Sequence, residues 1–310
     1  MGKNPEISVV MSAYNSAGLI QRAIDSILGQ TFDNFELIIL DDGSTDGTAD
    51  VVRANTDKRI RLILLQHAGL PVALNHGISV SEAPLIARHD SDDFSHHIRL
   101  EKQLAEFSNN PNLDVVATWH HVVDEMGHFL GLKKTVLDDS SLKAMLARRN
   151  PFAHGTVMMK KAAVVNVGGY NERLFYSQDY DLWLRIAHAG LRFKCIPESL
   201  YNYSISPDSI ARGWTKLSYA GEIRKNSARV TEEFTTPIIS SVSTRRKNAL
   251  WNYAIGSLAL ENGRRCRASK FFRKSLMSDP TFWRAGLRLG LSILPHSFSE
   301  RLSNLLRRRR

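Results

Sequence analysis

Two groups of carboxylates stand at the ends of apolar stretches and have the residue types best suited to chemistry. Residues 35–40 (FELIIL) run into residues 41–42 (DD), and residues 84–89 (PLIARH) run into residues 90–93 (DSDD). Short apolar runs bounded by Gly and Asp are typical of buried strands, and an open α/β sheet binds ligands at the carboxyl ends of its strands. Carboxylates gathered there repel each other unless a cation or a donor-rich ligand compensates them. The pattern therefore indicates a site for a divalent metal and a phosphorylated ligand.

The elements that position these clusters alternate between strand and helix over the first ninety residues. Such alternation is typical of a mostly parallel sheet with helices on both faces. Neither GxGxxG nor GxxxxGK[ST] follows a predicted strand, which argues against a dinucleotide site or a P-loop. The pattern predicts strands over residues 7–11, 35–40, 60–65 and 84–89, and helices over 19–28, 47–55 and 70–80, with Thr45 or Asp46 as the cap of the second helix.

The second half of the chain is less regular. It predicts a helix over residues 99–107, strands over 114–118 and 155–160, and an amphipathic helix over 178–189. We expect one α/β domain over residues 1–212 and a helical appendage over residues 213–310. Residues 249–278 show a weak tetratricopeptide-like pattern, and a single such repeat would depend on the catalytic domain for its packing.

The basic character of the chain is concentrated near its C-terminus. The net charge is +10, but residues 241–310 hold 16 Lys and Arg against 3 Asp and Glu, and residues 1–240 hold 25 against 28. The α/β domain is therefore slightly acidic, and the appendage is strongly basic. Apolar residues alternate with arginines over residues 283–294, which suits contact with an anionic membrane surface. No aromatic-interleaved basic motif supports nucleic-acid binding.

Compartment and membrane signals are few. Two distant cysteines, Cys195 and Cys266, form no CxxC motif, which favours a reducing compartment over a disulfide framework. No signal peptide is visible before the first strand, and no run of eighteen apolar residues occurs. We expect a cytoplasmic protein, peripheral at the inner face of the membrane if its basic region binds lipid.

Five segments in order resemble those of family 2 glycosyltransferases over roughly residues 5–205. They are ISVVMSAYN, FELIILDDGSTDGT, ALNHGI, IARHDSDD and SQDYDLWLR. The resemblance implies a GT-A fold, a Rossmann-like α/β domain with a DxD motif. It also implies inverting transfer of a sugar from a nucleotide diphosphate donor to a hydroxyl of a glycan or lipid-linked acceptor. Assembly of surface polysaccharide or lipopolysaccharide is the expected process.

The same resemblance implies the roles of individual residues. Asp90 and Asp92 match the DxD motif that holds Mn²⁺ or Mg²⁺, and Asp179 matches the general base. Gln178 stands where the family usually has Glu, which removes one carboxylate beside the base. A UDP-sugar is the favoured donor because carboxylates accept hydrogen bonds from a uracil-type N–H. The residues expected to bind the nucleotide sugar are Ala13, Tyr14, Asn15, Asp41, Asp42, Asn75, Asp90, Ser91, Asp93 and His154, with Asp93 orienting the ribose or supporting its neighbours.

Each cluster also has a structural interpretation. Residues 42–44 suit an Asx turn, residues 90–93 suit a helix cap, and Asp179 with Asp181 suits a helix dipole. The order of the carboxylates at the ends of successive strands favours the functional interpretation. Five other histidines have no metal-ligand spacing, and no role is assigned to them: His67, His76, His89, His96 and His97.

Two other functions remain open at this point. A nucleotidyltransferase also places carboxylates and metal at a sheet edge, but it usually brings a basic phosphate loop, and residues 12–18 have no basic residue. A non-catalytic scaffold would hold a nucleotide in the α/β domain and a partner on the helical region.

Overall fold

The computed structural model describes residues 4–174, 176–210 and 243–293. These residues form two compact units. Unit 1 comprises residues 4–121, 133–174 and 176–204, and unit 2 comprises residues 122–132, 205–210 and 243–293. The boundary expected at residue 212 lies outside the described residues, so that division stays a prediction.

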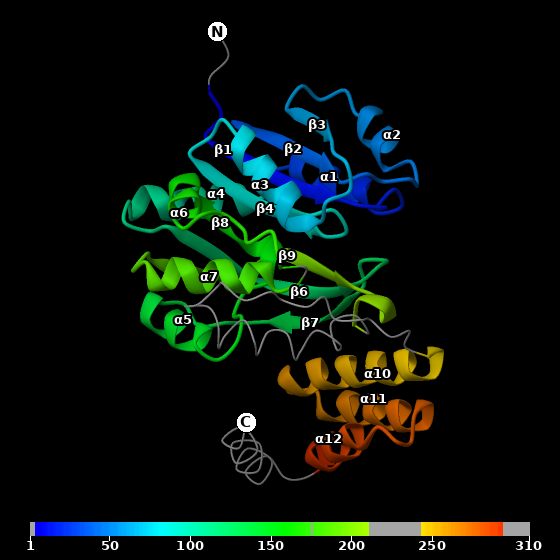
Figure 1. Cartoon of the computed structure of the whole chain (residues 1–310). Coiled ribbons are helices and arrows are strands. Elements are labelled where there is room, and N and C mark those ends of the chain that lie inside the picture. Colours follow the sequence, from blue (N-terminus) through cyan, green and yellow to red (C-terminus); the bar gives the residue numbers. More distant parts are fainter. Residues whose placement is uncertain (1–3, 175, 211–242, 294–310) are drawn as a thin grey trace. The chain divides into compact units, whose positions relative to one another are not determined.

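A nine-stranded sheet organises the described residues, in the order β3-β2-β1-β4-β8-β6-β9-β5, with β7 paired to β6 (Figure 1). Strand β1 pairs in parallel with β2 and β4, and β2 pairs in parallel with β3. Strand β8 is antiparallel to β4 and β6, and β5 is antiparallel to β9. The expected α/β class with a GT-A sheet is confirmed. The strands are β1 (Ile7–Ala13), β2 (Phe35–Asp41), β3 (Ile60–Leu64), β4 (Leu85–Asp90), β5 (Phe94–Ser95), β6 (Val115–Asp124), β7 (Phe129–Lys133), β8 (Met158–Lys160) and β9 (Phe193–Ile205).

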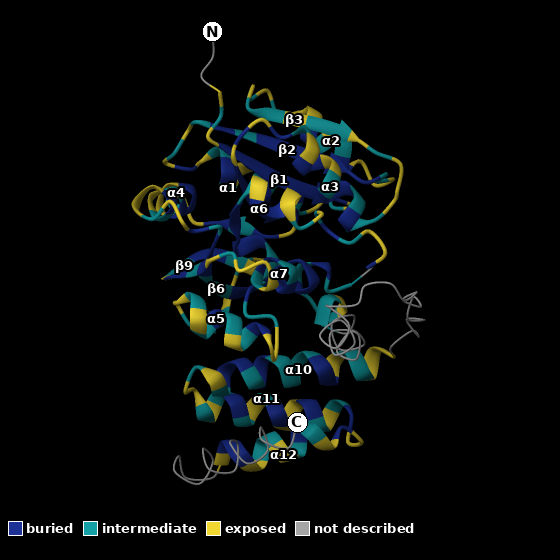
Figure 2. Cartoon of the chain, turned by 60° about the vertical axis from the view of Figure 1, so that its left-hand side comes forward, coloured by how far each residue is buried: buried dark blue, intermediate teal, exposed yellow. Residues whose placement is uncertain are grey.

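Helices cover both faces of this sheet because successive strand residues point to opposite faces. On β1, Val9 and Met11 pack into one buried cluster and Val10 packs into the other. In Figure 2 the strands are mainly buried, and exposed residues gather on the outer sides of the helices. Helices α1 (Ile20–Leu28), α2 (Thr48–Arg53) and α4 (Arg99–Asn109) pack into the first cluster, and α3 (Leu70–Val80), α5 (Asp139–Leu146), α6 (Lys161–Asn166) and α7 (Gln178–His188) pack into the second.

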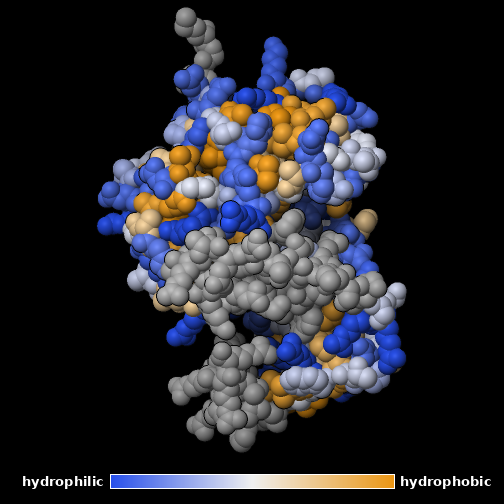
Figure 3. All heavy atoms as spheres, in the orientation of Figure 1, coloured by the Kyte–Doolittle hydropathy of each residue, from blue (hydrophilic) through white to orange (hydrophobic). Residues whose placement is uncertain are grey.

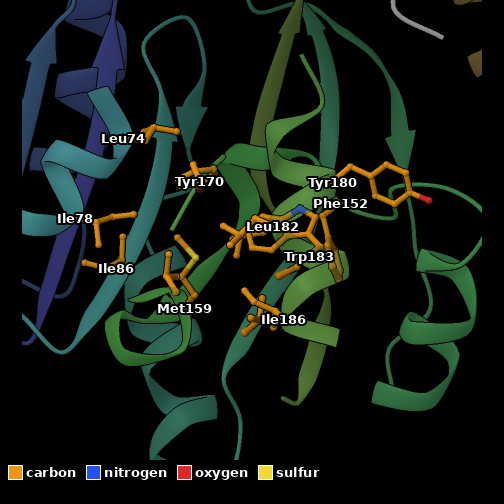
Figure 4. Close-up of a cluster of buried hydrophobic side chains, with 14 of the residues drawn as sticks. Leu74, Ile78, Ile86, Phe152, Met159, Tyr170, Tyr180, Leu182, Trp183 and Ile186 are labelled. Carbon is orange, nitrogen blue, oxygen red and sulfur yellow. The ribbon is translucent and has the colours of Figure 1, made fainter. Parts of the chain in front are cut away.

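Trp183 of α7 is a central residue of the second cluster (Figure 4). It is fully buried, and Phe152 meets it edge-to-face at 6.2 Å between ring centroids. Buried aromatic pairs with this geometry contribute more than their buried area alone. The amphipathic pattern of residues 178–189 therefore reflects a real core face, which holds the acidic first turn of α7 in place.

Residues 155–160 do not form one strand, so that prediction is wrong for its first half. A 3-10 turn, η1 (His154–Thr156), comes first, and β8 begins only at Met158. The Thr156 side chain and backbone N–H both donate to the Ala153 carbonyl, at 2.7 and 3.0 Å. This local bonding competes with the sheet ladder.

Unit 2 contains the C-terminal helices that the sequence predicts, α10 (Thr244–Glu261), α11 (Arg265–Ser278) and α12 (Trp283–Ile293). Helices α10 and α11 approach closely at Gly256, which leaves room for the fully buried Phe272 ring. The buried Ser275 hydroxyl donates to the Ala249 carbonyl at 2.7 Å. Among the described residues, no helix has both the length and the apolar character needed to cross a bilayer.

Candidate active site

Three parallel strands end in register at one edge of the sheet. Ala13 of β1 lies opposite Asp41 of β2, and Ser12 lies opposite Asp90 of β4. The prediction that the two acidic clusters share one edge is therefore confirmed. The last residues of these strands and the loops that follow them hold eight of the ten residues expected to bind the nucleotide sugar.

Asp41 and Asp42 are almost fully buried and hold the loops around them. Asp41 Oδ1 accepts the Ser44 N–H at 3.0 Å. The two Asp42 carboxylate oxygens each accept a backbone N–H at 2.9 Å, from Ala68 and from Gly69. Both residues are under 4% exposed. The carboxylates thus stabilise the shape of the sheet edge, and the remaining lone pairs are what a ligand could use.

The loop after β1 interlocks with the loop after β2. Asn15 has a left-handed backbone (φ 49°), which Asn adopts more readily than most residues. Its side-chain oxygen accepts the Thr45 N–H at 2.9 Å, and its own N–H donates to Ser44 Oγ at 2.9 Å. Ser16 lies 3.0 Å from Ser91, hydroxyl to hydroxyl, which ties this loop to the second acidic cluster. Asn15 and Ser91 therefore hold the loops together.

Exposed aromatic rings lie beside this edge. Tyr14 is 48% exposed and stacks on His67, with 4.2 Å between ring centroids and 23° between planes. His67 Nδ1 lies 3.0 Å from the Asp42 carboxylate. The sequence assigned His67 no role, and its position in the loop before α3 is the only signal that could have suggested one.

The second acidic cluster contains three carboxylates in different environments. Asp90 is paired with the fully buried Arg88, Nη2 to Oδ1 at 2.5 Å. Asp92 is exposed at the pocket, where desolvation by the walls and then the charge of Asp90 raise its pKa to about 6. Asp93 is fully buried and accepts the Ser204 N–H at 2.6 Å. Of the two roles expected for Asp93, its position favours support of its neighbours.

The sequence pattern alone did not indicate a role for Arg88, although a charge inside the apolar run IARHD is a signal for one. Its Nε and Nη1 have no hydrogen-bond partner within the described part of the chain. A buried guanidinium with one ion pair holds Asp90 in a fixed place. Tyr201, also fully buried, adds to this support because its hydroxyl accepts the Asp90 N–H at 3.1 Å.

Asp179 lies in the first turn of α7, behind Ser177, whose φ of 55° is unusual for a residue other than Gly. Asn150 Nδ2 donates to Asp179 Oδ2 at 2.7 Å. Burial is the largest effect on Asp179 and raises its pKa. Hydrogen bonds from the Tyr180 N–H and from Asn150 oppose this shift, the charge of Asp90 adds to it, and the pKa stays above its ordinary value. A carboxylate with a raised pKa is suited to accept a proton near neutral pH. Gln178 beside it is buried.

His154 and Asn75 meet at Tyr170. His154 Nε2 lies 2.7 Å from the Tyr170 hydroxyl, and burial followed by the charge of Arg88 keeps the pKa of His154 well below its usual value. The Asn75 side-chain amide bonds both backbone groups of Tyr170, at 2.8 and 2.9 Å. Asn75 thus joins α3 to the turn before α7, a structural contact outside the pocket.

A pocket of about 620 Å³ in unit 1 joins four of the predicted residues: Asp90, Asp92, His154 and Asp179. Ala13, Tyr14, Asn15, Asp41, Asp42, Asn75, Ser91 and Asp93 do not line it. The other lining residues include Leu70, Thr118, Trp119, His120, Lys133, Lys134, Thr135, Met145, Arg149, Asn150, Phe152, Tyr176, Gln178 and Tyr203.

The pair Asp90 and Asp92 fits one divalent cation that also takes ligands from a substrate. Burial, followed by the charge of Asp90, raises the pKa of Asp92, and a cation relieves the repulsion between the two carboxylates. Within the described residues, no group of three or more Asp, Glu, His or Cys side chains could hold a metal by itself. A cation here would therefore need oxygen ligands from a bound diphosphate, as Mg²⁺ commonly does.

Strand order, helices on both faces and acidic loops at the carboxyl edge together define a GT-A fold. The family model for Glycosyl transferase family 2 matches residues 8–168. EpsE of Bacillus subtilis (strain 168) is 37% identical over 218 residues, which cover 68% of this chain and 77% of EpsE. The O-antigen biosynthesis glycosyltransferase WbnJ of Escherichia coli is 36% identical over 204 residues, 64% of this chain and 79% of WbnJ.

Among solved structures, the mannosyltransferase PcManGT from Pyrobaculum calidifontis, in complex with GDP-Man and Mn²⁺, has a TM-score of 0.57. It is 17% identical, and the match covers 92% of this chain and 78% of PcManGT. This likeness concerns the fold, and the sequence matches concern the family. The chain belongs to glycosyl transferase family 2 and is a glycosyltransferase.

Proposed function

We propose that this glycosyltransferase is an inverting, metal-dependent enzyme that moves a sugar from a nucleotide diphosphate to a hydroxyl of a glycan or lipid-linked acceptor. The observation that carries the proposal is one pocket lined by Asp179 and by the carboxylate pair Asp90 and Asp92. The raised pKa of Asp179 supports a base role, and the repulsion within the pair supports a cation site. We assign the chemistry to residues 1–212.

The chemistry divides between the two sides of the pocket. Mn²⁺ or Mg²⁺ bound by Asp90 and Asp92 together with the diphosphate would supply the positive charge that neutralises the leaving group. Asp179 accepts the acceptor hydroxyl's proton as that oxygen bonds to the anomeric carbon. The bond from that carbon to the diphosphate breaks on the opposite face, which inverts the configuration. Asn150 keeps the Asp179 carboxylate oriented through its 2.7 Å hydrogen bond.

The comparisons support the substrate class at a coarse level. PcManGT binds GDP-Man with Mn²⁺, and WbnJ acts in O-antigen biosynthesis, so a nucleotide sugar and a surface glycan are our proposed donor and product. A UDP-sugar is the donor we favour, because the Asp42 carboxylate beside the exposed Tyr14 can accept a uracil-type N–H. Family membership favours this function over a nucleotidyltransferase.

Calorimetric titration with UDP-, GDP- and dTDP-sugars, with and without Mn²⁺, tests the donor site. We expect metal-dependent binding of one nucleotide class, lost in Asp92→Ala. Asp50→Asn is the matched control, because Asp50 is an exposed carboxylate paired only with Arg53 among the described residues. Binding that ignores the metal, or survives Asp92→Ala, contradicts the assignment.

Release of the nucleotide, with water as acceptor, tests the base. We expect Asp179→Asn to bind the nucleotide sugar as wild type does and to lose about 10²–10⁴-fold in rate. A rate equal to that of wild type removes Asp179 from the mechanism. If wild type itself binds but never turns over the donor, the scaffold function becomes the better explanation.

We further propose that helix α12 contacts an anionic membrane at the cytoplasmic face. Trp283 and Leu287 lie four residues apart on one side of α12 and are 65% and 42% exposed. Arg284 lies over the Trp283 ring at 5.6 Å, so basic and apolar groups share this surface. Figure 3 shows hydrophobic residues next to hydrophilic ones on the helical unit. The terminal arginines lie outside the described residues.

Flotation with phosphatidylglycerol vesicles tests this contact. We expect the full chain to float at low salt, to stay in solution with phosphatidylcholine alone, and to lose flotation in the double variant Trp283→Ser/Leu287→Ser. Met277→Ser is the control, since Met277 is 82% exposed on α11. A full chain that stays off anionic vesicles contradicts the membrane proposal and leaves the sugar-transfer proposal intact.

A further inference from the structure

The pocket has a basic wall that the proposed donor site does not use. Lys134, which follows β7, and Arg149, which follows α5, both line it. Trp119 of β6 lies between polar neighbours on the same lining. Most of the residues expected to bind the nucleotide sugar come instead from the ends of β1, β2 and β4 and from the loops that follow them. The basic wall therefore belongs to the part of the pocket left for the acceptor.

Lys134 and Arg149 are both exposed, and neither forms an ion pair with any other described residue. By contrast, the nearby Lys143 is paired with Asp139 at 2.8 Å. Exposed cations usually face open solvent, but these two share a pocket that also contains three carboxylates. Their charge is available to a ligand.

Trp119 gives this wall a fixed flat surface. Its Nε1 donates to the Thr135 carbonyl at 3.0 Å, which sets the orientation of the indole. Lys134 Nζ lies 4.9 Å from the ring centroid, within the range of a cation–π contact. The ammonium is thus held at the pocket by the ring face, and Trp119 is itself a lining residue.

Lys133 adds a third cation to the lining of this wall. Burial, followed by the charges of Lys133 and His121, lowers the pKa of the lining residue His120 to about 4, so this imidazole is neutral near pH 7. An anion in the pocket would be repelled by the carboxylates of Asp90 and Asp92 and attracted to the opposite charge of the wall. Charge alone would therefore orient an anionic acceptor with its charged end away from the donor.

We propose that Lys134 and Arg149 bind an anionic group of the acceptor, with Trp119 as a surface for the adjoining sugar ring. The group is a phosphate or diphosphate, as on a lipid carrier, or the carboxylate of an acidic sugar. The planar guanidinium of Arg149 can donate two parallel hydrogen bonds to either group, and the Lys134 ammonium adds a point charge. The inference rests on the proposed function, because it takes this pocket as the place of transfer.

Calorimetry in EDTA with geranyl diphosphate, D-glucuronate and neutral D-glucose tests the inference and distinguishes the two sources. EDTA removes any cation that could hold a diphosphate at Asp90 and Asp92. We expect wild type to bind one anionic probe at least tenfold more tightly than Lys134→Met/Arg149→Met does. The double variant Lys58→Met/Arg192→Met, which removes two exposed cations outside the pocket lining, should bind as wild type does.

Three outcomes of this titration overturn the inference. They are equal binding by all three proteins, no binding of either anionic probe at millimolar concentration, and a loss of glucose binding in Lys134→Met/Arg149→Met as large as its loss of binding to the anions.

A parallel titration with nucleotide sugar and Mn²⁺ separates this inference from the proposed function. We expect Lys134→Met/Arg149→Met to bind the donor as wild type does. If donor affinity falls tenfold instead, the cations serve the donor's diphosphate and the inference is wrong. If no protein binds a nucleotide sugar, the proposed function fails, and the EDTA titration still reports on the wall.

Discussion

Gly155→Ala should destabilise the fold and disturb the proposed metal site through one contact. A Cβ at Gly155 would overlap the Tyr201 hydroxyl and Cζ and lie 2.9 Å from Cε1. Tyr201 has no room to move: it is fully buried, Arg99 lies 5.1 Å over its ring, and His89 lies 5.2 Å from it edge-on. The ring must shift, and its hydroxyl then leaves the Asp90 N–H.

The size of the effect follows from two terms. Overpacking a well-filled core costs about 1–3 kcal/mol, and a buried N–H without an acceptor costs about 1–3 kcal/mol. We therefore expect Gly155→Ala to lower the free energy of unfolding by about 2–6 kcal/mol and the melting temperature by roughly 4–24 °C. Calorimetry gives the melting temperature, and the Mn²⁺-dependent binding of the donor should weaken as well.

Two further variants test the contact between Gly155 and Tyr201. Gly18→Ala is the control, because a Cβ there meets nothing within 4 Å, and it should melt within about 2 °C of wild type. Tyr201→Phe removes only the hydroxyl and should cost about 1–3 kcal/mol without overpacking. If Gly155→Ala melts like Gly18→Ala, the close approach of Gly155 and Tyr201 does not exist in the protein.

Other predictions concern α7. Because burial raises the pKa of Asp179, we expect kcat/KM to fall as the pH drops through that raised pKa, and the remaining slow rate of Asp179→Asn to lack this limb. A raised pKa also means that the stability from a protonated Asp179 is present at low pH and is lost as the pH rises through the folded-state pKa. Asp179→Asn should therefore melt no lower than wild type at pH 8, and a clear loss of melting temperature there would contradict this. Tyr180→Phe should lower the free energy of unfolding by about 1–3 kcal/mol with donor binding unchanged, since the Tyr180 hydroxyl donates to the buried Leu146 carbonyl at 2.6 Å; urea titration measures it, and an unchanged midpoint would refute the bond.

The sequence predicted the elements of the first ninety residues well because each of them carries its own periodic pattern. Strand β2 and helix α3 can be identified from local spacing, and their ends carry Gly or Asp. The long strand β6 was predicted only to residue 118, because His120 and His121 interrupt the apolar run. The turn η1 was predicted as a strand because its bonding to Ala153 leaves no mark on the hydrophobic pattern.

The candidate site was predicted in part for a related reason. The positions of Asp90, Asp92 and Asp179 follow from strand ends and a helix start, which are local signals. Adjacent residues nevertheless differ in environment: Asp92 is exposed at the pocket, and Asp93 is fully buried. That difference depends on strand β9, because its Ser204 N–H donates a hydrogen bond to the Asp93 carboxylate, more than a hundred residues away in sequence.

The amino-acid sequence by itself determined the α/β class, the family and the edge of the sheet where the carboxylates gather, because periodicity, turn residues and motif order are properties of neighbouring residues. Only the tertiary structure decided which side chains become partners. The hydrogen bond from Ser204 to Asp93, the stacking of Tyr14 on His67 and the basic wall of Lys134 and Arg149 depend on which strands and loops lie side by side. Strand order brings residues that are far apart in the chain into contact, and the resulting burial changes the pKa of their side chains and their exposure to a ligand.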